Sequence, residues 1–197
     1  MSKLKPTPNL SEAIEFSHRL IDTSLWIRNA EELQAAAAVL EIDIRLYWSE
    51  CRVKDNHDIQ VSNRKYVQGP YSMLMAYSLE NYFKAIIIHD KSDSLRGILL
   101  TNLPRYLNDH NLVQLAKQAK VTLDISEEEL LNRLSRFSTW AGRYPIPTGP
   151  NALTTMQKLS DGKTYLAAYL APHDIDRINK FIARLRTTLT ERQSEQP

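Results

Sequence analysis

One stretch of the sequence, residues 69–90, is apolar around almost its whole circumference. It reads GPYSMLMAYSLENYFKAIIIHD. Its apolar residues recur at steps of three and four, which is the period of an α-helix, and further apolar residues widen that face beyond one stripe. A helix of this kind is stable only when other elements pack around it. We therefore predict that residues 69–90 form the central helix of the fold.

Two charged residues stand inside this apolar stretch. Glu80 and Lys84 are four residues apart, in the order that favours an ion pair along a helix. We expect them to lie on a narrow exposed strip, where such a pair contributes about 0.3 kcal/mol to stability.

Amphipathic patterns before the central stretch predict two further helices. Ser11 can cap the first, and the pattern breaks at residues 23–24. A second helical face runs from Ala30 to about Cys51. Residues 52–68 are polar and aperiodic, which predicts a long surface connection to the central helix.

Amphipathic patterns continue after the central stretch. A short helix is expected to begin at residues 108–109 and to stop before Val121. Ser126 and Glu129 have the spacing of a capping box for a longer helix, and Gly142 provides a stop.

The C-terminal part contains a short helix candidate at residues 165–170 and a clearer amphipathic helix after Pro172. Five or six amphipathic helices with almost no two-residue alternation predict an all-α protein. We expect an antiparallel helical bundle that forms a single domain over residues 1–197.

Composition limits the classes of function. The formal net charge of +2 is too small to indicate nucleic-acid binding by itself, although a local basic groove remains compatible with it. No apolar run approaches the roughly 20 residues that span a bilayer, and the first residues lack the apolar segment of a secretory signal. We expect a cytoplasmic protein with no membrane-inserted segment.

Cys51 is the only cysteine, so the sequence cannot form an internal disulfide or a zinc site with two sulfur ligands. Cys51 follows Tyr47 and Trp48 in a helical pattern. A packed thiol is the common interpretation of such a position, and a catalytic nucleophile is the alternative.

Three segments, in this order, resemble the HEPN superfamily. They are the central LENYFKAIII (79–88), the DHNLVQLA that opens the next short helix (109–116), and the WAGRYPIPT that ends the following helix (140–148). The resemblance covers roughly residues 30–147 and implies a HEPN-like core there, with a helical C-terminal extension at about 160–192. It also implies a homodimer.

Many HEPN proteins are metal-independent ribonucleases of toxin–antitoxin or phage-defence systems, and they use an arginine and a histidine with four to six residues between them. This spacing occurs at Arg52 and His57 and again at Arg105 and His110. In such a pair the arginine stabilises charge on the phosphate and the histidine transfers a proton. With 14 arginines and 5 histidines, about one match is expected by chance.

The resemblance offers a second interpretation of His110, because it matches a histidine–leucine turn that many noncatalytic members possess. We expect His110, Arg143 and Tyr144 to form a small polar pocket near Glu80 and Lys84. A guanidinium can bind phosphate through two hydrogen bonds, and an imidazole can change charge near neutral pH. The alternative is that Arg143 and Tyr144 only complete the end of a helix.

Two functions follow from this resemblance. The first is a noncatalytic HEPN-like module that binds a partner protein, a nucleotide or RNA. The second is a metal-independent ribonuclease in which Arg105 and His110 are catalytic. Neither function requires a cofactor or a metal ion, and we expect none.

Overall fold

The structure is a computed structural model that describes residues 9–53, 63–142, 150–152, 155–160, 162–166 and 168–195. Helices dominate the described residues, which confirms the predicted helical class. The α-helices are α1 (Leu10–Ile21), α2 (Thr23–Val53), α3 (Gln68–Leu95), α4 (Leu112–Gln118), α5 (Ile125–Arg136) and α6 (Asp174–Glu195). Short helical turns are η1 (Asn63–Val67), η2 (Arg105–Leu107), η3 (Phe137–Ala141) and η4 (Pro150–Ala152).

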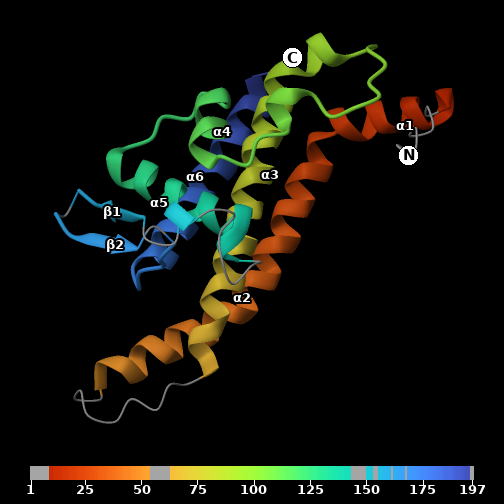
Figure 1. Cartoon of the computed structure of the whole chain (residues 1–197). Coiled ribbons are helices and arrows are strands. Elements are labelled where there is room, and N and C mark those ends of the chain that lie inside the picture. Colours follow the sequence, from red (N-terminus) through yellow and green to blue (C-terminus); the bar gives the residue numbers. More distant parts are fainter. Residues whose placement is uncertain are drawn as a thin grey trace.

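Helix α3 is the centre of the molecule. It contacts α1, α2, α4, α5 and α6, and α2 lies along one side of it while α4, α5 and α6 lie on the other (Figure 1). Tyr71, Leu79, Tyr82, Phe83 and Ile86 of α3 are each 0% exposed. Residues 69–90 therefore form the central helix, as their apolar circumference predicted. Helix α3 extends beyond this range at both ends.

The first two helices begin and end at other residues than those predicted. The cap of α1 is Asn9 rather than Ser11, because Asn9 accepts a hydrogen bond from the backbone of Glu12 while the Glu12 carboxylate accepts one from the backbone of Asn9. The break before α2 lies at Asp22, whose side chain accepts a hydrogen bond from the backbone of Ser24. Helix α2 therefore starts at Thr23, separated from α1 by Asp22 alone, and well before Ala30.

The caps of the next two helices also differ from the predicted ones. Helix α4 is capped by Asn111, which accepts hydrogen bonds from the backbones of Val113 and Gln114, and not by residues 108–109. Helix α5 is capped by Asp124, which forms a capping box with Glu127 in place of the Ser126–Glu129 pair. The sequence is compatible with both capping boxes. The Asp124–Glu127 box is the one that forms, and α5 therefore starts at Ile125.

The end of α5 has an unusual geometry. It continues as a π-helical turn, η3, and Gly142 donates a hydrogen bond to the carbonyl of Phe137, five residues earlier. A Cβ atom added to Gly142 would lie 2.5 Å from the Cβ of Met73 on α3. The absence of a side chain at Gly142 is thus required for the close approach of η3 to α3.

The C-terminal part contains a wrong assignment of secondary structure. Residues 164–166 form β2 (Thr164–Leu166), which pairs antiparallel with β1 (Met156–Lys158), so the predicted helix at 165–170 is absent. Helix α6 follows as predicted and packs against α3. Residues 54–62 of the predicted connection and residues 143–149 lie outside the described residues.

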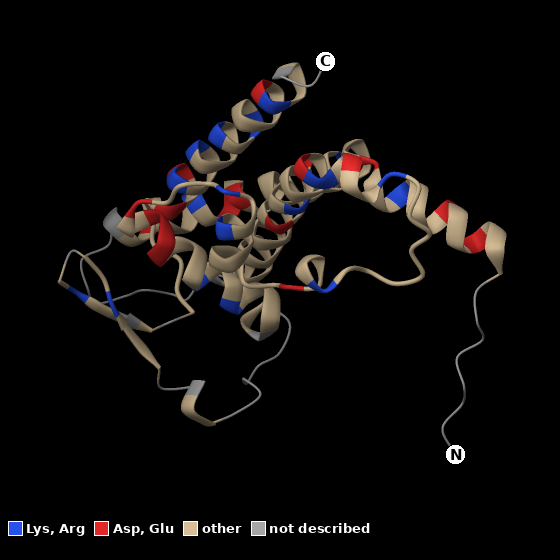
Figure 2. Ribbon diagram, turned by 90° about the horizontal axis from the view of Figure 1, so that it is seen from above, with Lys and Arg blue, Asp and Glu red and all other residues tan. Residues whose placement is uncertain are grey.

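Positive and negative charges are mixed over the described surface. In the view of Figure 2, α6 carries acidic residues toward its two ends and basic residues between them. Of the basic residues from 177 to 186, Arg177, Arg184 and Arg186 are each paired with an acidic residue. This distribution agrees with the small net charge of the sequence. A long basic track for a nucleic-acid backbone is therefore not a feature of the described residues, and a binding site for a charged ligand has to be local.

Candidate ligand site

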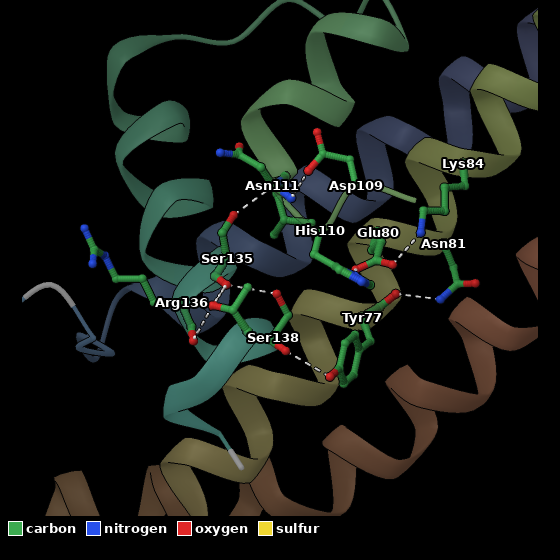
Figure 3. Close-up of polar contacts among 12 residues, drawn as sticks. Tyr77, Glu80, Asn81, Lys84, Asp109, His110, Asn111, Ser135, Arg136 and Ser138 are labelled. Carbon is green, nitrogen blue, oxygen red and sulfur yellow. Dashed lines mark hydrogen bonds and ion pairs between the residues drawn. The ribbon is translucent and has the colours of Figure 1, made fainter. Parts of the chain in front are cut away.

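A charged cluster connects α3 to the loop that precedes α4. The Nδ1 atom of His110 lies 3.0 Å from Oε2 of Glu80, and the Nζ atom of Lys84 lies 2.6 Å from Oε1 of the same carboxylate (Figure 3). Because an ionised carboxylate only accepts hydrogen bonds, His110 donates through Nδ1 and keeps Nε2 as its second ring nitrogen. The structure thus brings together three of the predicted site residues, His110, Glu80 and Lys84.

The burial of this cluster corrects the prediction made for Glu80 and Lys84. Glu80 is 6% exposed and Lys84 is 4% exposed, so the pair is not on a surface strip. The loop carrying His110 covers Glu80, and the Lys84 ammonium lies 6.0 Å from the centre of the Trp26 ring on α2. A buried carboxylate and ammonium lose their hydration, and their hydrogen bonds to each other replace it only while both are present.

The loop around His110 is held in place by local hydrogen bonds. Asp109 accepts a hydrogen bond from the backbone of Asn111, and the Ser135 hydroxyl of α5 accepts one from the backbone of Leu112. The Ser135 hydroxyl in turn donates to the carbonyl of Leu131. These bonds fix the loop against α5, so the position of His110 does not depend on the Glu80 contact alone.

A polar depression of about 470 Å³ lies between this loop and α5. Its lining is formed by side chains that can donate and accept hydrogen bonds. They are Asn108, Asp109, His110, Asn111, Asn132, Ser135, Arg136 and Thr139. A ligand in this depression would meet one guanidinium, one imidazole, one carboxylate, three amides and two hydroxyl groups. It would therefore need both acceptors and donors.

Arg136 supplies the guanidinium, and the sequence analysis did not identify it. Its guanidinium forms no ion pair with an acidic residue among those that the structure describes. Arg136 and His110 both line the depression, and in Figure 3 the Arg136 side chain extends away from His110, whose ring points toward Glu80. The polar run NDHN at 108–111 was a usable signal for the loop side of the site. A lone arginine at the end of a helix carries no such signal.

Arg105 lies elsewhere. It is exposed on η2 and is not among the residues that line the depression. The other matching pair, Arg52 and His57, and the predicted binding residues Arg143 and Tyr144 are outside what the structure describes. The depression therefore brings together an arginine and a histidine, but the arginine is Arg136.

Other candidate chemistry is limited within the described parts of the chain. No three side chains of histidine, cysteine, aspartate or glutamate in those parts form a group that could hold a metal ion. Cys51 is half-buried near the end of α2. The hydrogen bond between the Cys51 and Tyr47 side chains raises the pKa of the Tyr47 phenol, and burial of the phenol raises it further. None of the described helices combines the length and the apolar character of a membrane span.

Comparisons of this chain with protein-family models, curated proteins and solved structures find no match. The function therefore has to be inferred from the geometry of the site.

Proposed function

We propose that this chain is a noncatalytic, HEPN-like helical module that binds a nucleotide or a short single-stranded stretch of RNA in the depression between the 108–111 loop and α5. The observation that carries the proposal is that Arg136 of α5 and His110 of the preceding loop both line one polar depression of about 470 Å³. A ligand that contacts both groups must extend across the depression.

The chemistry of the lining favours a nucleotide over a bare phosphate ion. The guanidinium of Arg136 suits a phosphate, because it can form two parallel hydrogen bonds to phosphate oxygens. The carboxylate of Asp109 repels an anion but accepts hydrogen bonds from sugar hydroxyl groups. The amides of Asn108 and Asn132 can pair with base edges, which display both donors and acceptors.

Binding of labelled mononucleotides and short RNA oligonucleotides, followed by fluorescence anisotropy and calorimetry, tests this proposal. Arg136→Gln should weaken binding about tenfold or more, because a charge-assisted contact is lost. His110→Ala should weaken binding as well. The matched control is Arg96→Gln, because Arg96 is an exposed arginine near the far end of α3. Absence of binding, or equal losses for Arg96→Gln and Arg136→Gln, would reject the site.

One observation favours the ribonuclease as the second candidate. Glu80 orients His110 through Nδ1, and a carboxylate holds the imidazole of a general acid or base in this way. The directions of the two side chains argue against it. In Figure 3 Arg136 extends away from His110, whereas a phosphate undergoing cleavage has to contact both groups. RNA incubated without metal should remain intact. Cleavage that is lost in His110→Ala and kept in Arg96→Gln would establish the ribonuclease instead.

A further inference from the structure

Helix α2 carries a row of exposed apolar side chains. Val39 is 67% exposed, Ile42 is 63% exposed and Leu46 is 43% exposed, and Ala35 is exposed on the same row. We call these four residues the α2 seam. Single exposed apolar residues are common on protein surfaces. The spacing of this row, four, three and four residues, is that of the core positions in a coiled coil.

The seam faces away from the rest of the molecule. Ala30, Ala37 and Ile44 are the α2 residues that are 0% exposed, and they mark the side that packs on α3. At about 100° of rotation per residue, the seam is centred on the opposite side of the helix. Figure 1 shows α2 at the edge of the bundle. A second helix can therefore approach the seam without meeting the molecule's own bundle.

We propose that the α2 seam is a self-association surface on which two copies of this chain pack their α2 helices antiparallel. A two-fold axis between residues 40 and 41 pairs all four seam residues. Val39 of one copy then packs against Ile42 of the other, and Ala35 packs against Leu46. Each layer combines a smaller with a larger side chain, as in interdigitated helix packing.

Charge and size select this orientation. In a parallel pair, Arg28 would face Arg28 and Glu32 would face Glu32 of the second copy, and both side chains are about 70% exposed. In the antiparallel pair, Glu32 faces the hydroxyl of Ser49, so no like charges meet along the seam. Ala36 and Ala38 flank the seam and are exposed, and their small side chains permit a short distance between the helix axes.

The size of the seam sets the expected strength of association. Ala35 and Leu46 are about 16 Å apart along the helix, at 1.5 Å per residue. Four apolar layers over this length bury less than the roughly 800 Å² per partner of a standard interface. The dimer should therefore dissociate in the micromolar range.

Sedimentation equilibrium of the full chain, from low micromolar to submillimolar concentration, tests the proposal. Ile42→Glu should raise the dissociation constant at least about 100-fold, because two carboxylates enter the centre of the seam. Val39→Lys should act in the same direction. The matched control is Ile125→Glu, because Ile125 is 72% exposed on α5. A wild-type monomer at every concentration, or a dimer that Ile42→Glu and Val39→Lys leave intact, overturns the proposal.

Disulfide cross-linking tests the antiparallel register. In a Cys51→Ser background, copies with Ala35→Cys are mixed with copies carrying Leu46→Cys. The mixed pair should cross-link efficiently, because the two Cβ atoms face each other within the distance that a disulfide requires. Leu46→Cys copies alone should not, because their cysteines would be about 16 Å apart. Preferential linkage of Leu46→Cys copies to one another would indicate parallel packing and overturn the register.

Discussion

Among single residues, Glu80 is a buried carboxylate that holds two side chains from different parts of the chain. Its buried carboxylate accepts hydrogen bonds from Lys84 and His110, so removing either charge of the Glu80–Lys84 pair leaves the other buried without its ionic partner. We predict that Glu80→Gln lowers the free energy of unfolding by about 3 kcal/mol. The double variant Glu80→Gln/Lys84→Met should lose less than the sum of the two single changes. Urea unfolding of the three variants measures this coupling.

The control for this comparison of single and double variants is an exposed ion pair with the same spacing along a helix. Glu15 and Arg19 on α1 are 2.6 Å apart, with side chains 61% and 70% exposed. Their coupling should be below about 0.5 kcal/mol, because water and salt screen an exposed pair. Similar couplings for the two pairs would mean that Glu80 and Lys84 are hydrated in solution.

Asp124 makes the start of α5 sensitive to acid. Hydrogen bonds from the Ser126 hydroxyl and the Glu127 backbone lower the pKa of Asp124 below its ordinary value of 3.8. A lowered folded-state pKa gives stability that is present above the unfolded-state pKa and is lost as the pH falls through the folded-state value. Asp124→Asn keeps a good cap and removes this titration.

We therefore expect the melting temperature of Asp124→Asn to fall less than that of the wild type between about pH 5 and pH 2.5. Asp93→Asn provides the comparison for the loss of one surface carboxylate, because the Asp93 side chain is 86% exposed. Thermal unfolding of the three proteins at both pH values, followed by circular dichroism, gives the melting temperatures. Parallel curves for Asp124→Asn and the wild type would contradict the prediction.

At the scale of elements, the contact between η3 and α3 depends on the absence of a side chain at Gly142. A Cβ atom there would meet Met73 at 2.5 Å and the Phe137 carbonyl at 2.9 Å. Gly142→Ala should therefore cost about 1–3 kcal/mol, because η3 must move away from α3. Gly69→Ala is the matched control, since its nearest neighbour would be at an ordinary 3.8 Å. Chemical denaturation that ranks the two variants equally would mean that η3 is not packed on α3.

The helices were predictable because their apolar periodicity is strong, whereas their first residues were not. Asp124 and Ser126 each have a glutamate three residues later, so the sequence offers two capping boxes, and tertiary packing selects one. The strand at Thr164–Leu166 was missed because periodicity does not separate a strand from a helix over so few residues.

The site was predictable only where the sequence contained a local pattern. The histidine–leucine turn directed attention to His110, and the i,i+4 spacing directed it to Glu80 and Lys84. Their burial results from contacts with Trp26 and the 108–111 loop, which are distant in sequence. Arg136 joins the depression because α5 places its last turn beside that loop, and no local motif records this arrangement.

At the scale of the whole molecule, α6 belongs to the same core as α3, although the sequence suggested that it extends a smaller unit. Phe181 of α6 contacts Phe83 of α3 edge to face, with ring centres 6.0 Å apart. The carboxylate of Asp174, at the first turn of α6, accepts two hydrogen bonds from Arg133 of α5, at 2.6 and 3.0 Å, and both residues are buried. We therefore expect α6 and α3 to unfold together.

Hydrogen exchange of Ile182→Asp tests this cooperativity. Ile182 is 2% exposed on α6, and a carboxylate at this position would be buried without a partner. We predict that backbone amides of α3 and α6 both lose their protection in this variant, because one core loses packing on both sides. The adjacent Ala183 is exposed, so Ala183→Asp should leave the protection of both helices unchanged. Loss confined to α6 in Ile182→Asp would show instead that residues 174–195 form a separable extension, and that α3 is held by α2, α4 and α5 alone.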